Sequence, residues 1–184
     1  AFQLLDRDDE GNGRYTVTLA SEARAYLASL GHSSPVRIPS NMYIWATMNS
    51  ADQGVLPLDS AFKRRWTMEY VGLNDGEEAV RDWEIKFPFL TNPIKWNTFR
   101  RTVNSHLEQQ GVAEDRLLGP FFMTPRELAR KGDFESKILQ YLRDDVLRHA
   151  PNRLFSGSPS IGGLMDAYRR GDNIFVPEIK FDEN

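Results

Sequence analysis

Two short polar segments hold the side chains best suited to chemistry in this sequence. The first, TMNSADQ at positions 47–53, contains Thr47, Asn49 and Asp52, and the second ends in the basic cluster 63–65, which includes Arg64 and Arg65. An Asn side chain can donate to a phosphate oxygen and orient an attacking water. A guanidinium can neutralise the charge on a phosphoryl group in transfer, a role that suits the planar fork of Arg better than Lys. These residue types therefore predict phosphoryl-transfer chemistry.

The elements around these segments would have to place them together. Residues 41–49 are almost all apolar until the run ends in polar side chains, a pattern that predicts a strand buried on both faces of a parallel sheet. Ligands of such sheets bind beyond the carboxyl ends of the strands. We expect a short helix over 58–65 and another strand over 66–71. The guanidinium groups would then lie at the end of the short helix that follows the Asn.

Each of these residues also has a simpler interpretation. An Asn after a strand often forms a turn, a cluster of basic residues is often a solvated face, and Asp59 can act as a helix cap. The chemical interpretation is favoured by the order of the elements: an apolar run, TMNSADQ, a short spacer, LDSAFKRRW and a second strand.

The rest of the chain predicts two parts with a boundary near residues 73–76. Before it, we expect an acidic turn at 6–13 that is solvated rather than a calcium loop, a strand at 14–19, a helix at 21–30 ended by Gly31, and an extended segment at 35–39. After it the pattern is helical, with apolar stripes over 96–107 and 134–146 and a shorter helix over 161–170.

Composition excludes several classes of protein. The 184 residues carry a net charge of −3, so no global positive field recruits nucleic acid. The absence of cysteine excludes disulfide scaffolds and thiolate metal sites and fits a cytoplasmic protein. No apolar run has the length of a membrane helix. The three histidines are scattered, so no metal site is expected.

The run TMNSADQ…LDSAFKRRW resembles the TMNTADR…LDxAxRRRF stretch of McrB-like AAA+ proteins, which include motor subunits of restriction systems that cleave modified DNA. The opening AFQLLD is similar to the helix that follows the Walker B segment in that family, and residues 116–123 and 138–146 resemble its helical lid. The resemblance spans most of the chain, although only the central motif is specific. It implies an α/β fold, with the C-terminal part of an AAA+ core at 1–73 and an all-helical lid at 74–184.

The resemblance also implies roles for individual residues. Asn49 matches the sensor-1 position that reads the γ-phosphate, with Thr47 beside it at the nucleotide, and Asp52 matches the acid of the signature loop. Arg64 and Arg65 match the run that supplies an arginine finger to the neighbouring subunit. Gln53 stands where the family usually has Arg, which leaves guanine versus adenine preference open.

The sequence contains no GxxxxGK[ST] loop and no apolar run that ends in Asp-Glu, so the chain alone is not expected to hydrolyse nucleotide. If the opening resemblance holds, both motifs lie before Ala1 in a longer parent. The parent is then expected to be a homo-oligomeric ring, such as a hexamer, that binds GTP or ATP with Mg²⁺. It would act on DNA indirectly, through a partner nuclease, and no membrane partner is expected.

Two other readings remain. The chain could be a non-enzymatic helical interaction module, or part of a MoxR-like AAA+ chaperone. For Arg116 we expect an ion pair at a helix end rather than a nucleotide contact. The acids at 133, 135, 144 and 145 and the pairs Arg100-Arg101 and Arg169-Arg170 are expected to be ordinary solvated charges.

Overall fold

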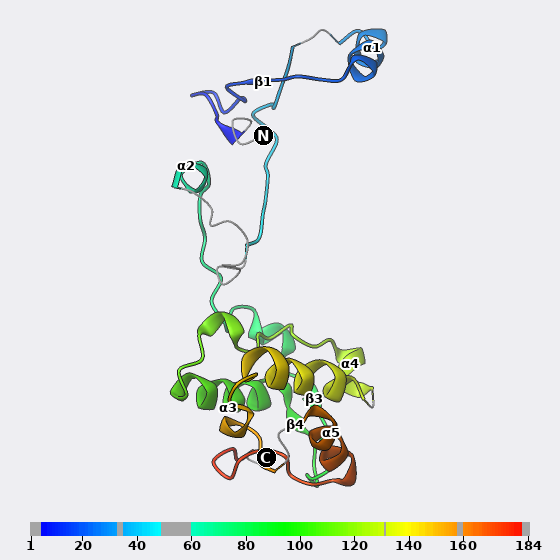
Figure 1. The fold of residues 1–184 in the computed structure, drawn as a ribbon. Coiled ribbons are helices and arrows are strands. Elements are labelled where there is room, and N and C mark those ends of the chain that lie inside the picture. The colour runs from blue at the N-terminus through cyan, green and yellow to red at the C-terminus, as the bar shows by residue number, and fades with distance from the viewer. Residues whose placement is uncertain (1–4, 33–34, 49–59, 131, 158–159, 182–184) are drawn as a thin grey trace. The chain divides into compact units, whose positions relative to one another are not determined.

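The computed structural model describes residues 5–32, 35–48, 60–130, 132–157 and 160–181. Contacts along the chain divide it into two units, Ala1–Tyr70 and Val71–Asn184 (Figure 1). The assignment of the first part to an AAA+ core and of the second to its lid stays a prediction.

The first unit contains few regular elements. Strands β1 (Thr16–Val17) and β2 (Val36–Arg37) pair antiparallel, and helix α1 (Ser21–Ser29) lies between them in the sequence. Helix α2 spans Ser60–Lys63. Helix α1 ends as predicted at Gly31, whose φ of +80° suits glycine, and the N–H groups of Gly31 and His32 donate to the carbonyls of Ala28 and Leu27.

The apolar run before Asn49 does not form the predicted buried strand. Residues 42–48 have no ladder partner among the described residues, and the side chains of Tyr43 and Trp45 are 79% and 88% exposed. The segment 67–71, also predicted as a strand, is irregular, with Tyr70 73% exposed. A buried strand needs neighbours that satisfy its backbone groups and cover both faces, and no described strand lies beside either segment.

The second unit is built mainly from helical segments, visible in the lower part of Figure 1. A short antiparallel ladder of β3 (Glu84–Ile85) with β4 (Ile94–Lys95) departs from the all-helical expectation. The helical segments are η2 (Glu77–Val80), α3 (Trp96–Gln109), η3 (Glu114–Arg116), α4 (Pro125–Ala129), the π-helical η4 (Phe134–Leu139) and η5 (Tyr141–Val146), η6 (Pro151–Arg153) and α5 (Ile161–Arg170).

Helix α3 crosses the core of this unit. The four apolar residues that predicted the helix, Trp96, Phe99, Val103 and Leu107, are all completely buried. Around them lies a cluster of aromatic rings centred on Phe87, which contacts the rings of Phe89, Phe99, Phe134, Tyr168, Phe175 and Phe181. Large aromatic side chains supply much of the buried apolar area in a core of this kind.

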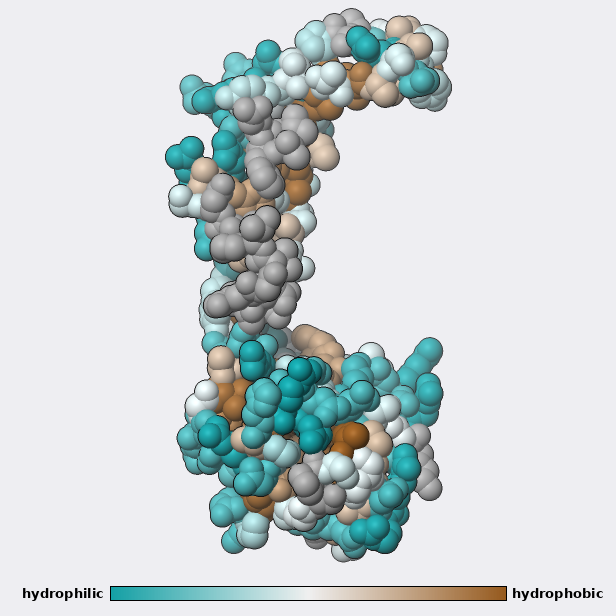
Figure 2. All heavy atoms as spheres, in the orientation of Figure 1, coloured by the Kyte–Doolittle hydropathy of each residue, from teal (hydrophilic) through white to brown (hydrophobic). Residues whose placement is uncertain are grey.

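Helix α5 has the predicted bounds and contacts η4. Its first turn is capped by the Ser160 side chain, which accepts from the N–H of Gly163 at 3.1 Å. Its last turn is followed by Gly171, in the left-handed conformation with φ +89°. The outer face of the second unit is mostly hydrophilic in Figure 2, as expected for a unit with a closed apolar core.

Candidate functional site

The residues predicted to meet the nucleotide are only partly described. Asn49, Asp52 and Gln53 lie outside the described residues, so their predicted roles stay predictions. Thr47 is described and exposed, at the end of the irregular run 42–48. Arg64 and Arg65 follow helix α2 directly.

Arg65 is held by contacts inside its own unit. Its Nε lies 2.6 Å from Oδ1 of Asp6, its Nη2 lies 3.3 Å from Oδ2, and its Nη1 donates to the carbonyl of Ala61. The hydrogen bond from Arg65 lowers the pKa of the Asp6 carboxyl below its usual value, so Asp6 is ionised at neutral pH. This fork-to-carboxylate geometry fixes the guanidinium of Arg65 against residue 6.

Arg64 differs from Arg65 in its exposure and its contacts, although its charge also helps to lower the pKa of Asp6. It is exposed, and its side chain has no ion pair within the described residues. Its backbone N–H continues the turn of α2 by donating to the carbonyl of Ser60 at 3.1 Å. The backbone of Arg64 is therefore ordered by α2, while its guanidinium stays open to a partner.

A tight turn carries Asp6 to this contact. We call residues 6–14 the N-terminal turn. Its Arg7 donates to the carbonyls of Pro39 at 3.1 Å and Met42 at 3.0 Å, and Gly13 donates to the carbonyl of Ile38 at 2.7 Å. The turn is thus attached both to the segment that leads into 42–48 and to the end of α2.

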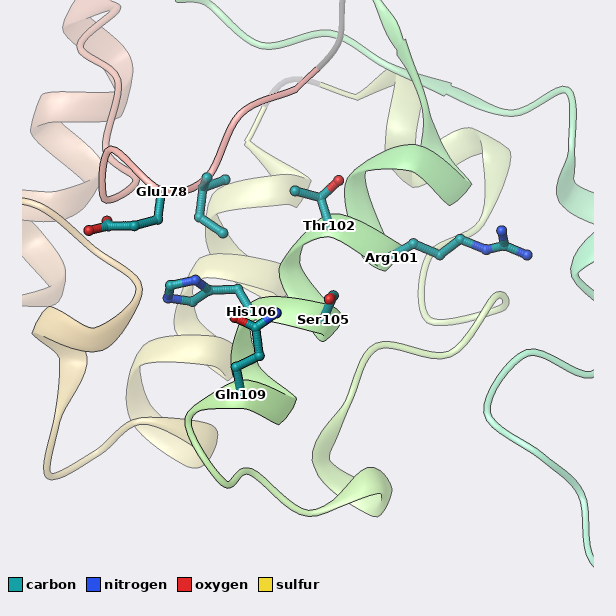
Figure 3. A pocket seen from close by; sticks show the side chains of 7 residues that line it. Arg101, Thr102, Ser105, His106, Gln109 and Glu178 are labelled. Atoms are coloured by element: carbon teal, nitrogen blue, oxygen red, sulfur yellow. The ribbon is translucent and has the colours of Figure 1, made fainter.

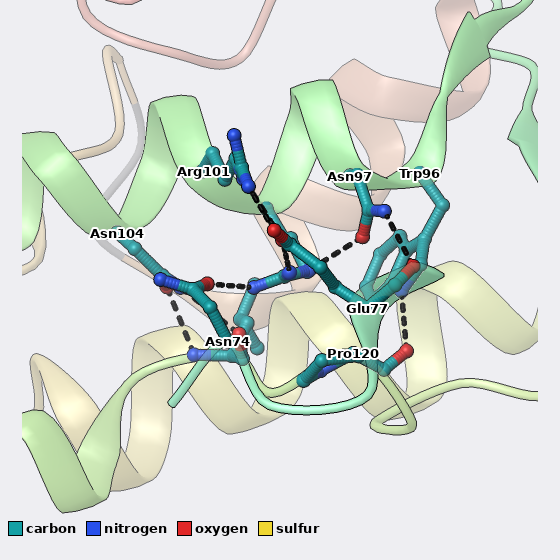
Figure 4. A network of polar contacts seen from close by, with 9 residues as sticks. Asn74, Glu77, Trp96, Asn97, Arg101, Asn104 and Pro120 are labelled. Atoms are coloured by element: carbon teal, nitrogen blue, oxygen red, sulfur yellow. Dashed lines mark hydrogen bonds and ion pairs between the residues drawn. The ribbon is translucent and has the colours of Figure 1, made fainter. Parts of the chain in front are cut away.

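The second unit contains a dense polar network at the start of α3 (Figure 4). Arg100, which is completely buried, donates from Nε to Asn97 at 2.8 Å, from Nη1 to Asn74 at 2.7 Å, and from Nη2 to the carboxylate of Glu77. Glu77 also accepts from Arg101, whose Nε lies 2.9 Å from Oε2. The hydrogen bond from Arg101, with the charges of both arginines, lowers the pKa of Glu77.

The expectation that Arg100 is an ordinary solvated charge is therefore wrong. Helical spacing could have predicted that Arg100 is buried. It lies four residues after Trp96 and three before Val103, on the buried face of α3. Each of the three guanidinium nitrogens donates to an acceptor of this chain. The network ties residues 74–77 to α3 and leaves no open position for a ligand at Arg100.

A shallow hollow lies on the outer side of α3 (Figure 3). It has a volume of about 460 Å³ and is lined by Arg101, Thr102, Ser105, His106, Gln109, Glu178 and Ile179. Two of its polar groups are already engaged, since Arg101 pairs with Glu77 and Nε2 of His106 lies 2.6 Å from the carbonyl of Arg153. We therefore do not place the candidate site in this hollow.

The acidic residues of η4 and η5 do not form a catalytic set. Glu135, expected to be solvated, is instead only 4% exposed, and its Oε2 lies 2.6 Å from Nε of Arg169. Asp144 pairs with the neighbouring Arg143 at 3.0 Å. No group of acidic or histidine side chains in the described ranges is arranged to hold a metal ion.

The structure also shows the surroundings of Arg116. The Arg116 side chain is exposed at the end of η3 and takes part in no ion pair between described residues, so the expected helix-end ion pair is absent there. Its carbonyl accepts from the Tyr141 hydroxyl at 3.1 Å.

Within the described parts of the chain, none of the helices combines the length and the apolar character required to span a bilayer.

Comparison with known proteins gives one informative similarity. The chain is 44% identical over 181 residues to the component YdiS of the type II restriction enzyme BsuMI from Bacillus subtilis (strain 168). The match covers 97% of this chain and 52% of that protein, so the chain spans about half the length of this curated relative. No protein-family model matches the chain, and no solved structure matches it. The chain is therefore a homologue of a restriction-system component.

Proposed function

We propose that this chain belongs to a ring-forming AAA+ NTPase of a restriction system, and that it supplies sensor 1, the arginine finger and the lid. In this proposal the parent protein hydrolyses GTP or ATP with Mg²⁺. Hydrolysis reshapes the contacts between neighbouring subunits, and a partner nuclease uses that motion on DNA.

One observation carries the proposal. TMNSADQ and LDSAFKRRW occur in the order and at the spacing of an AAA+ sensor 1 and arginine finger, in a chain 44% identical to a protein named as part of a restriction enzyme. The relative's name places it in a restriction system and says nothing of nucleotides. The nucleotide part of the proposal therefore depends on the motif.

The contacts of Arg64 and Arg65 support different roles for these two residues. A finger that acts in a neighbouring subunit must project from its own subunit and must not be locked in an ion pair there. Arg64 fits this requirement, because it is exposed and outside any ion pair between described residues. Arg65 fits a different role, because Asp6 and the carbonyl of Ala61 already hold its guanidinium. We assign the finger to Arg64.

Within the same proposal, Asn49 and Thr47 bind at the γ-phosphate and Asp52 orders the loop between them and the finger helix. Asn49 would donate its amide to a γ-phosphate oxygen and orient the attacking water. The guanidinium of Arg64, from the next subunit, would neutralise the charge that develops on the equatorial oxygens. These groups position and stabilise the transferring phosphoryl group, which is how proteins accelerate such reactions.

The proposal is tested on the full-length protein that contains this chain, by measuring GTP and ATP hydrolysis with Mg²⁺. We expect nucleotide hydrolysis by the wild type, and a loss of about 10³-fold or more in turnover for Arg64→Ala with nucleotide affinity retained. Arg24→Ala, which removes an exposed arginine of α1, is the matched control and should hydrolyse nucleotide at the wild-type rate.

Two outcomes would contradict the proposal. A full-length protein that binds and hydrolyses neither nucleotide, in the presence of its partner subunits and DNA, would support a non-enzymatic interaction module. Unimpaired hydrolysis by Arg64→Ala would remove the finger assignment and leave only the wider proposal of nucleotide hydrolysis.

A further inference from the structure

We infer that the N-terminal turn, residues 6–14, is a positioning element that holds helix α2, and with it the proposed finger Arg64, through Asp6. The inference rests on the proposed function, because that function makes Arg64 the finger. The turn itself touches neither the nucleotide nor the reacting atoms in this account.

The turn is rigid enough for this task. Oδ1 of Asp8 accepts from the N–H groups of Glu10 at 3.1 Å and Asn12 at 2.8 Å, which closes the tip. The N–H of Arg14 donates to the carbonyl of Asp6 at 2.8 Å, and Arg7 forms a β-bridge with Gly13. Asp6 and Arg7 are therefore set side by side at the base of a closed loop.

Arg7 and Gly13 anchor the turn within its own unit. The guanidinium of Arg7 donates to the carbonyls of Pro39 and Met42, which attaches the turn to the backbone at the end of the extended segment. Gly13 is buried against Ile38, and a Cβ at that position would lie 3.1 Å from the Ile38 nitrogen. The close approach of the two backbones thus favours glycine there, because a larger residue would push the Ile38 backbone away.

Asp6 holds helix α2. Its carboxylate receives both Nε and Nη2 of Arg65, a residue 59 positions later in the chain. Arg65 in turn donates to the carbonyl of Ala61 in α2, so the ion pair fixes the end of the helix from which Arg64 projects. The long side chain of Arg64 magnifies any tilt of that helix, and small displacements of a catalytic group cost large factors in rate.

The anchored turn therefore holds helix α2 through the contact of Asp6 with Arg65. If the ion pair is lost, α2 gains freedom and the Arg64 guanidinium spends less time at the γ-phosphate of the neighbouring subunit. Nucleotide binding depends on other groups and should change little. The expected signature is a lower kcat at nearly constant KM.

A double-mutant cycle in the full-length protein tests the inference, with Asp6→Asn, Arg65→Gln and the double variant. We expect each single variant to lower kcat by about tenfold to 100-fold, with KM changed by less than about twofold. The double variant should be no slower than the slower single variant, because both changes break the same contact. Asp9→Asn removes the same charge from an exposed position of the turn and should leave kcat unchanged.

Hydrogen exchange gives a second readout that does not depend on activity. The amides of residues 60–66 should exchange faster in Asp6→Asn than in the wild type or in Asp9→Asn. Unchanged exchange and kcat in Asp6→Asn, or losses of kcat that multiply in the double variant, would overturn the inference. A wild-type protein without hydrolysis would instead remove the proposed function, and the exchange result alone would then decide whether Asp6 holds α2.

Discussion

At the scale of single residues, two pairs of adjacent arginines differ in the exposure and contacts of their side chains. Arg64 and Arg65 are adjacent, yet one is exposed and the other is held by Asp6. Arg100 and Arg101 are adjacent on α3, yet their side chains are 0% and 57% exposed. In both pairs the two residues have the same side chain in different environments. A substitution of one arginine is therefore a control for the same substitution of the other.

The second pair yields a prediction about stability. Arg100→Met should lower the free energy of unfolding by about 3 kcal/mol, because it removes the hydrogen bonds that a completely buried guanidinium makes to Asn74 and Asn97 and takes one cation from Glu77. Arg101→Met removes an exposed partner of the same carboxylate and should cost at most about 1 kcal/mol. Urea unfolding of the two variants, followed by circular dichroism, measures the difference. Equal losses would show that the burial of Arg100 contributes nothing.

At the scale of elements, helix α4 depends on its first turn. The Thr124 side chain accepts from the N–H of Glu127, and the Glu127 carboxylate accepts from the N–H of Thr124 at 2.7 Å. Lys137 of η4 binds the other oxygen of the carboxylate at 2.8 Å. The hydrogen bond from Lys137, together with those from Thr124, lowers the pKa of Glu127 to about 2.

This capping box makes the stability of the second unit depend on pH. Because the folded-state pKa of Glu127 lies below its unfolded value of 4.5, the contribution of its carboxylate is complete above about pH 5 and is lost as pH falls toward 2. The difference in unfolding free energy between the wild type and Glu127→Gln should therefore be constant from pH 7 to about pH 5 and shrink below it.

Urea titrations at several pH values check this expectation. Glu78→Gln, which alters an exposed glutamate that has no ion pair within the described residues, is the matched control. A Glu127→Gln difference that stays constant down to pH 3 would contradict the role given to the carboxylate.

Helical elements were predictable from the sequence because their signal is local. The stripe at Trp96, Phe99, Val103 and Leu107 marked α3, and the cap Ser160 and Gly171 flank α5 at the predicted bounds. The stripe over 134–146 was also found, although not its π-helical winding. The strand predicted at 41–49 failed because an apolar run carries no information on whether a partner strand lies beside it.

The polar contacts were harder to predict for a related reason. Helical spacing could have shown that Arg100 is buried, but nothing local joins it to Glu77, or Asp6 to Arg65, across 23 and 59 residues. The sequence identified Arg64 and Arg65 as candidates for the finger but could not show which of them projects from the subunit. The structure distinguishes them through the contact with Asp6, while Asn49 and Asp52 lie outside the described residues.

At the scale of the whole molecule, the proposed nucleotide site requires more than one subunit. In the proposed ring, Asn49 of one subunit and Arg64 of its neighbour complete a single site, which is a heterologous contact that closes on itself. A subunit that lacks Asn49 can still provide a finger, and a subunit that lacks Arg64 can still hold a nucleotide.

Mixing two inactive variants of the full-length protein tests this claim most directly. Asn49→Ala and Arg64→Ala should each be nearly inactive alone, and equal amounts mixed under conditions that allow subunit exchange should recover up to about a quarter of the wild-type hydrolysis rate, since random neighbours rebuild that share of sites. Recovery would show that the two residues act from different subunits. A mixture no more active than its components, with subunit exchange verified by mass spectrometry, would contradict the shared site.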